Sequence, residues 1–195
     1  MIEHYYSEDP KSRHRERTIN ATLRGEQFTF QTDSGTFSPR DIDKATMLLI
    51  EYTPISQGEK VLDLGCGYGP VGISIAKTTN ATVTMSDINR RAIKLSKDNA
   101  RINHVDTTII HSDGYEKITE KFDTILLNPP HSAGRELCTK LIRESKEHLT
   151  QKGKISIVAF HNKGGKYYEQ ILKGLFPHVE TLCKKGGIRV YVGRM

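Results

Sequence analysis

The sequence predicts a doubly wound α/β fold, a mostly parallel sheet of seven strands that ends in an antiparallel hairpin. Three observations support this prediction. From residue 60 onward, short apolar runs alternate with segments of helical periodicity. The glycine-rich stretch DLGCGYG joins the first of these runs to the first helical segment. Only Gly186 and Gly187 separate the last two apolar runs, and so short a turn can join only antiparallel strands.

The composition indicates one soluble globular domain without metal or membrane. The chain has 195 residues, 36% of them hydrophobic and 27% charged, which suits a single packed core. No apolar run approaches the roughly 20 residues that span a bilayer, and the polar N-terminus resembles no signal peptide, so we expect a cytoplasmic protein. Cys66, Cys138 and Cys183 lie far apart and the histidines form no ligand pair, so we predict neither a disulfide framework nor a metal site.

The first part of the chain is predicted to be an extension of the main domain. Residues 1–40 contain a polar arm and then two short apolar runs around Arg24–Glu26, a pattern typical of a β-hairpin. Residues 41–195 form the predicted main domain. It opens with apolar residues at helical spacing, and Pro54 ends that helix.

Strands and helices then alternate to the end of the chain. The predicted strands cover residues 60–64, 81–87, 107–113, 122–128, 154–160, 178–185 and 188–194. The predicted helices cover residues 70–79, 89–104, 134–149 and 165–175. Such sheets bind ligands at the carboxyl ends of their strands, so the chemistry is expected there.

The first strand of this series ends in the glycine-rich turn. The glycines at 65, 67 and 69 let the backbone turn tightly and let a ligand approach with no Cβ in the way. Asp63 precedes them by two residues, and the helix that follows offers free N–H groups to an anionic or carboxylate-bearing ligand. The alternative is a plain glycine turn.

The next two strands each end in an aspartate. Asp87, 18 residues after Gly69, can accept both hydroxyl protons of a ribose, or it can cap the helix that follows. Asp113 can accept the exocyclic amine of an adenine, or it can be a turn residue before a glycine. The two carboxylates predict a nucleoside over the sheet, and the fourth strand ends nearby at Asn128.

These features resemble the class I S-adenosylmethionine-dependent methyltransferases, which have a Rossmann-like sheet. More narrowly, the chain is similar to the small methyltransferase domain of the ribosomal RNA guanine-N2 methyltransferases that act on the small subunit. The stretches HYYSEDP, DSGTFSPRDIDKATMLLI, VLDLGCGYGPVGI, NPP and KKGGIRVY fall in that family's order. Larger members carry a second, N-terminal copy of the domain, so this chain corresponds to the catalytic half.

The resemblance implies S-adenosylmethionine as the cofactor. It places the methionine part at the glycine loop, the ribose at Asp87 and the adenine at Asp113, with residues 35–38 lining the pocket. Phe37 is either part of that lining or a core aromatic. The implied cofactor-binding residues are Phe37, Asp63, Gly65, Cys66, Gly67, Asp87, Ile88, Asp113, Gly114 and Asn128.

Asn128, Pro129 and Pro130 are the predicted catalytic residues. The lone pair of an exocyclic amine is delocalised, and it must point at the sulfonium methyl group to react. The Asn128 oxygen and the Pro129 carbonyl can accept the two N–H bonds and orient that lone pair. The two prolines fix the carbonyl direction. The alternative is a rigid corner without a catalytic role.

The predicted acceptor is guanine N2 in small-subunit ribosomal RNA, free or in its ribosomal particle. The net charge of +6 suits an anionic partner, and Lys11, Arg13 and Arg15 are predicted phosphate contacts. His131 replaces the usual aromatic or apolar residue after NPP; it either stacks on the target base or faces solvent. Open alternatives are adenine in DNA or RNA, a protein glutamine, and a non-catalytic RNA-binding factor. An NAD-dependent oxidoreductase is disfavoured because the spacing is GxGxG, not GxGxxG.

Overall fold

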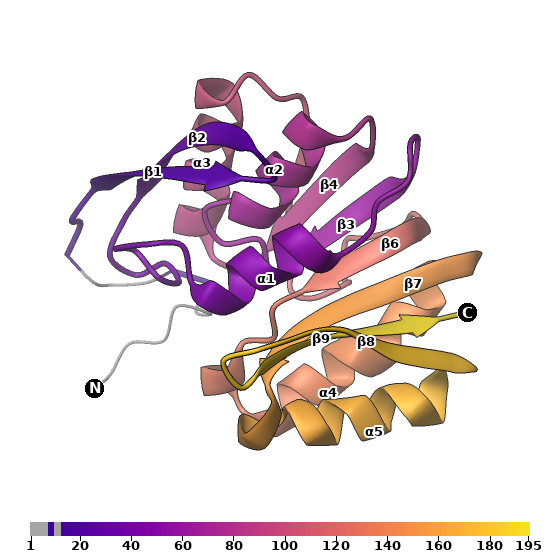
Figure 1. The fold of residues 1–195 in the computed structure, drawn as a ribbon. Helices are drawn as coiled ribbons and strands as arrows, with labels where there is room; N and C mark the ends of the chain where they lie inside the picture. The colour runs from indigo at the N-terminus through magenta and orange to yellow at the C-terminus, as the bar shows by residue number, and fades with distance from the viewer. Residues whose placement is uncertain (1–7, 10–12) are drawn as a thin grey trace.

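The computed structural model describes residues 8–9 and 13–195, with His131 described by its backbone alone. A seven-stranded sheet lies between two layers of helices, and a separate two-stranded hairpin covers one end (Figure 1). The hairpin consists of β1 (Arg17–Leu23) and β2 (Glu26–Thr32). The large sheet consists of β3 (Lys60–Leu64), β4 (Thr82–Asp87), β5 (Thr108–His111), β6 (Phe122–Leu127), β7 (Leu149–Phe160), β8 (His178–Lys185) and β9 (Ile188–Arg194). The helices are α1 (Lys44–Tyr52), α2 (Pro70–Thr78), α3 (Arg90–Ile102), α4 (Arg135–Glu144) and α5 (Gly165–Leu175).

The strand order confirms the predicted doubly wound sheet. It runs β5-β4-β3-β6-β7-β9-β8, with parallel pairing from β5 to β7 and antiparallel pairing for β9 against both of its neighbours. The chain moves outward from β3 to β5 and then returns to place β6 on the other side of β3. This reversal makes the carboxyl ends of β3 and β6 the point where a ligand is expected.

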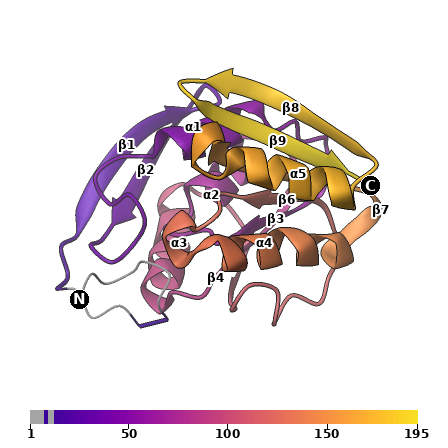
Figure 2. The ribbon, with the colours of Figure 1, turned by 90° about the horizontal axis from the view of Figure 1, so that it is seen from below.

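Two apolar cores lie on opposite faces of the sheet, because side chains alternate along each strand. On β3, Val61 belongs to the core under α1, α2 and α3, whereas Leu62 belongs to the core under α4 and α5. Figure 2 shows α4 and α5 running side by side on their face. The hairpin residues Phe28 and Phe30 share the first core with α1 to α3.

Two asparagines at the C-terminal end of α3, Asn99 and the C-cap residue Asn103, attach the hairpin to the domain. Asn103 accepts from Thr29 N at 3.1 Å and donates to Thr29 O at 2.8 Å. One turn earlier, Asn99 accepts from Gln31 N at 2.7 Å and donates to Gln31 O and to Tyr68 O, each at 2.8 Å. These side chains pair with the β2 backbone as a neighbouring strand would, and Asn99 links β2 directly to the glycine loop.

Two neighbouring predicted boundaries were wrong by five residues each, and the strand predicted to end at Asp113 ends at His111. The helix predicted over 134–149 ends at Glu144, a 3-10 turn covers Ser145–His148, and β7 starts at Leu149, five residues before the predicted strand. Leu149 pairs with Phe122, and the register then shifts. A Cβ on Gly153 would lie 3.0 Å from both the Leu149 side chain and the Phe122 carbonyl, a tight approach that favours glycine at this irregularity in the strand. Helical periodicity in the sequence carries no information about this pairing.

Within the described part of the chain, no helix combines the length and the apolar character that crossing a membrane requires.

Candidate functional site: a nucleoside pocket at the carboxyl edge of the sheet

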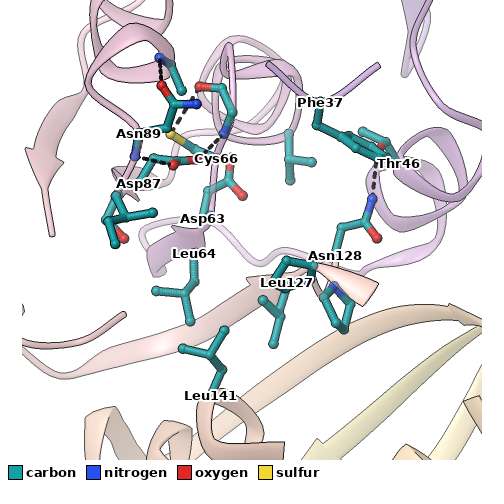
Figure 3. A pocket seen from close by; sticks show the side chains of 18 of the residues that line it. Phe37, Thr46, Asp63, Leu64, Cys66, Asp87, Asn89, Leu127, Asn128 and Leu141 are labelled. Atoms are coloured by element: carbon teal, nitrogen blue, oxygen red, sulfur yellow. Dashed lines mark hydrogen bonds between the residues drawn. The ribbon is translucent and has the colours of Figure 1, made fainter. Parts of the chain in front are cut away.

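A cavity of about 430 Å³ opens at the carboxyl ends of the parallel strands. Its size falls in the range of about 300–1,000 Å³ that holds small-molecule ligands and cofactors. The loops that follow β3, β4, β5 and β6 contribute its walls, and the segment before α1 and the start of that helix close it from one side (Figure 3). The predicted residues in its lining are Phe37, Asp63, Gly65, Cys66, Gly67, Asp87, Ile88, Asp113, Gly114, Asn128, Pro129 and Pro130.

The glycine loop has the open backbone that the sequence predicted. Gly65, Gly67 and Gly69 have φ values of 73°, 59° and 95°, in the left-handed region that favours glycine. At Gly65 and Gly67, an added Cβ would meet nothing within 4 Å, so the backbone faces open space in the cavity. At Gly69 an added Cβ would lie 2.7 Å from the Ile73 side chain, so a glycine is needed for the loop to pack closely against the first turn of α2. The loop therefore leaves room for a ligand beside its backbone.

Asp63 lies buried beneath this loop. Its Oδ2 accepts from Gly72 N at 2.8 Å, which ties β3 to the first turn of α2. Burial, with a smaller effect from the Asp87 charge, raises the pKa of Asp63 to about 7, although the Gly72 hydrogen bond opposes this. A cationic ligand in the cavity would favour the ionised carboxylate. Burial also raises the pKa of the Cys66 thiol, so this side chain stays neutral.

Asp87 is held at the end of β4 by backbone donors. Its Oδ2 accepts from Gly67 N and its Oδ1 from Asn89 N, both at 2.8 Å. Burial raises the pKa of Asp87, against these hydrogen bonds. The N-cap of α3 is Asn89, which accepts from Arg91 N and Ala92 N, so the alternative that Asp87 caps this helix is wrong. The Ile88 backbone also donates to this carboxylate, so three donors occupy its roughly four lone-pair sites and capacity for a ligand hydroxyl remains.

The other end of the cavity lies after β5. Asp113 is exposed at its rim, and its carbonyl accepts from Glu116 N at 3.1 Å in a turn that brings Gly114 beside the side chain of Leu141. Ile88 lines the cavity between Asp87 and this turn, with its carbonyl 2.8 Å from His111 Nε2. The placement is compatible both with adenine binding by Asp113 and with a simple turn.

Phe37 faces the cavity from the N-terminal side. It is half-buried and lies near Thr46, across the opening from Asp63 (Figure 3). Asn89 Nδ2 donates to Gly35 O at 2.9 Å, which holds this segment against the α3 N-terminus. Phe37 is thus part of the cavity lining, not of the core alone.

The structure identifies a residue that positions the predicted catalytic amide. Asn128 Nδ2 donates to Thr46 Oγ1 at 3.0 Å, so the amide is fixed by a helix far away in sequence (Figure 3). Thr46 was not among the residues predicted from the sequence. A polar residue between the apolar Ala45 and Met47 of a helix was the available signal, but its partner could not be identified from the sequence.

Part of the predicted substrate-binding set is not brought to the cavity. Arg13 and Arg15 are exposed outside its lining, and Arg15 N donates to Asp33 Oδ1 at 2.6 Å. Lys11 and the His131 side chain lie outside the described residues, so their predicted roles stay predictions.

The comparisons with known proteins agree with this geometry. The methyltransferase small domain family model matches residues 27–192. The uncharacterized protein YbxB of Bacillus subtilis is 38% identical over 192 residues, 96% of each chain. Ribosomal RNA small subunit methyltransferase C of Haemophilus influenzae is 34% identical over 171 residues, 85% of this chain and 51% of that protein. The chain thus spans about half the length of this relative.

A solved structure supports the cofactor. The T. thermophilus 16S rRNA N2 methyltransferase RsmC, in complex with AdoMet and guanosine, matches with a TM-score of 0.83 and 27% identity, over 92% of this chain and 50% of that one. The glycine loop beside open space and the carboxylate of Asp87 fit S-adenosylmethionine as the bound group. The chain belongs to the methyltransferase small domain family and has the fold and cofactor of a class I S-adenosylmethionine-dependent methyltransferase.

Proposed function

We propose that this protein methylates the exocyclic N2 of guanine in small-subunit ribosomal RNA. The fixed amide of Asn128 carries the proposal. Because Nδ2 donates to Thr46, Oδ1 remains to accept a hydrogen bond from a ligand in the same cavity as the glycine loop. The relatives favour this acceptor, since their names assign them to small-subunit ribosomal RNA. Such an acceptor also places the enzyme in the cytoplasm.

The residues that follow β6 compensate for the weak nucleophilicity of the guanine amine. Bound S-adenosylmethionine supplies an electrophilic methyl group on a positively charged sulfur. Asn128 Oδ1 and the Pro129 carbonyl accept the two N–H bonds of the guanine amine, which favours a tetrahedral nitrogen and directs its lone pair at that methyl group. Neither group acts as a strong base, because the methylated amine releases its proton to water.

The prolines make this pair of acceptors rigid. Each proline ring fixes its own φ, and Pro130 restricts Pro129 to extended conformations. The Pro130 carbonyl accepts from Ala133 N at 2.8 Å, which closes the loop beyond the site. The direction of the Pro129 carbonyl is therefore set before the substrate arrives.

Removing the amide tests this role. In Asn128→Ala, we expect the methyl-transfer rate to fall by about 10²–10³, the loss typical of a group that acts in the transition state. S-adenosylmethionine affinity, measured by titration calorimetry, should change far less than the rate, because the proposed main role of Asn128 is to orient the acceptor although it also lines the cofactor cavity. Transfer near the wild-type rate would refute the orienting role.

The acceptor is identified by product analysis. The purified protein is incubated with methyl-labelled S-adenosylmethionine and, separately, with naked small-subunit RNA and with small subunits from cells that lack the gene. We expect N2-methylguanosine after digestion to nucleosides. Label in N6-methyladenosine, in a protein glutamine, or in neither RNA sample would contradict the proposal.

A further inference from the structure

A second hollow, of about 420 Å³, opens beside the nucleoside pocket, and nothing in the proposed mechanism uses it. It lies between the first residue of α4, the turn that follows β7 and the first turns of α5. Its lining consists of Arg135, His161, Asn162, Gly164, Lys166, Tyr167 and Gln170. We call this feature the flanking hollow.

The strand order places the flanking hollow on the acceptor side of the reaction. Along the carboxyl edge, the predicted adenine and ribose contacts follow β5 and β4, the glycine loop follows β3, and Asn128 follows β6. The next strand is β7, whose last residue, Phe160, lines the nucleoside pocket and is 39% exposed. His161, the next residue, already lines the flanking hollow. If the acceptor base reaches Asn128 from the β7 side, the neighbouring nucleotides of its RNA chain therefore lie next to the flanking hollow.

The side chains of this region combine aromatic rings with positive charge. The Arg135 guanidinium lies 5.1 Å from the centre of the Tyr167 ring, and Tyr167 is 38% exposed. Lys163 Nζ lies 5.6 Å from the centre of the Phe160 ring. Exposed aromatic rings beside cations are the usual means of holding single-stranded RNA, since bases stack on the rings and the cations meet phosphates.

The local charge is positive. Of the described residues that line the flanking hollow, none is acidic, whereas Arg135 and Lys166 are basic and exposed. The nearest acids in sequence are Glu136, exposed on α4, and Glu169, whose Oε1 accepts from Lys173 Nζ at 2.6 Å. The β8–β9 turn lies next to this region, because Gly187 O accepts from His161 N at 2.9 Å. It adds positive charge, since Lys184 and Arg189 are cross-strand neighbours beside the turn.

We propose that the flanking hollow binds the nucleotide next to the target base in a single-stranded RNA acceptor. The base of that nucleotide stacks on Tyr167 and the Arg135 guanidinium, and Lys166 contacts its phosphate. This inference rests on the proposed function, since it needs an RNA acceptor. It adds a binding site for the RNA chain, separate from the two carbonyl oxygens of Asn128 and Pro129 that orient the guanine amine.

Three variants of one residue test the stacking. A fluorescent single-stranded RNA that carries the methylated sequence is titrated with wild type, Tyr167→Phe and Tyr167→Leu. We expect Tyr167→Leu to bind about ten-fold more weakly, because leucine keeps the apolar volume but offers no ring to stack on. Tyr167→Phe should bind as wild type does. In steady-state methylation, the loss should appear in KM for RNA, while kcat and S-adenosylmethionine affinity stay unchanged.

A matched pair of lysines tests the phosphate contact. Lys166→Ala should weaken RNA binding and reduce the slope of log affinity against log salt by about one. Lys140→Ala, which removes a lysine of α4 that lies 3.8 Å from Glu144, should change neither. Wild-type RNA affinity in both Tyr167→Leu and Lys166→Ala would overturn this inference alone. A wild-type protein that methylates no RNA would overturn the proposed function, and the inference with it.

Discussion

Thr46 shows how a single hydroxyl can determine the geometry of the site. It is buried on α1, and its Oγ1 accepts the hydrogen bond from Asn128 Nδ2 at 3.0 Å. Without this bond, the amide could rotate and present its NH₂ group to the guanine amine. Both groups are hydrogen-bond donors, so the amine would lose its acceptor. In the proposed mechanism this hydroxyl acts on the Asn128 amide and not on the acceptor, so Thr46 is a positioning residue.

The substitution Thr46→Val keeps the shape and removes the acceptor. We expect kcat for RNA methylation to fall about ten-fold, less than for direct removal of Asn128, because the amide is still present but no longer oriented. KM and S-adenosylmethionine affinity should hardly change. Thr46→Ser should restore kcat because it keeps the hydroxyl. A Thr46→Val enzyme with wild-type kcat would show that the amide is oriented by other contacts.

At the scale of elements, α3 connects the two parts of the site. Its N-cap residue Asn89 contacts both Asp87 and Gly35, and its C-terminal end holds β2 through Asn99 and the C-cap residue Asn103. The hairpin therefore lies in a fixed position relative to the glycine loop, although β1 and β2 pair with no strand of the large sheet. The amphipathic pattern of residues 89–104 predicted this helix, but the pairing of its asparagines with a strand has no periodic signal.

Breaking one of these pairings should loosen the hairpin. Asn103→Ala leaves Thr29 N and O without their partner, and an unsatisfied buried polar group costs about 1–3 kcal/mol. We expect the free energy of unfolding, measured by urea denaturation, to fall by about that amount. The control is Asp98→Ala on the exposed side of the same helix, where the ion pair with Arg101 should contribute less than about 1 kcal/mol. Equal effects of the two substitutions would show that the hydrogen bonds between Asn103 and Thr29 do not stabilise the hairpin.

At the scale of the whole molecule, polar side chains form a ligand cavity at one edge of the sheet and a stabilising ion pair at the other. The carboxyl edge holds the cavity, whereas Glu59 at the amino edge joins three strands. Its carboxylate accepts from Lys154 Nζ at 2.8 Å and from Thr124 Oγ1 at 2.7 Å, with Glu59 14% and Lys154 8% exposed. Burial alone would raise the pKa of Glu59, but the Lys154 and Thr124 hydrogen bonds bring it below its usual value.

This cluster should affect stability and not ligand binding. Glu59→Gln leaves the nearly buried Lys154 without its counter-charge, and we expect a loss of about 3 kcal/mol at pH 7. Because the folded-state pKa of Glu59 is lowered, its contribution is complete above the unfolded-state pKa of about 4.3 and is lost as the pH falls through the folded-state value. The difference from wild type should therefore shrink below about pH 4. Urea denaturation across pH measures it, and a difference that stays constant with pH would contradict the ion pair. S-adenosylmethionine affinity is the internal control.

The sequence by itself determined the order of the elements, the open glycine loop, the carboxylate of Asp87 and the rigid NPP corner. Each of these is a local property, because periodicity, glycine and proline act on the backbone within a few residues. Only the tertiary structure decided that Thr46 holds Asn128, 82 residues away, that Asn89 and not Asp87 caps α3, and that Phe160 and Tyr167 border the acceptor side. These contacts depend on which strands become neighbours in the sheet, and that pairing depends on how the whole chain packs.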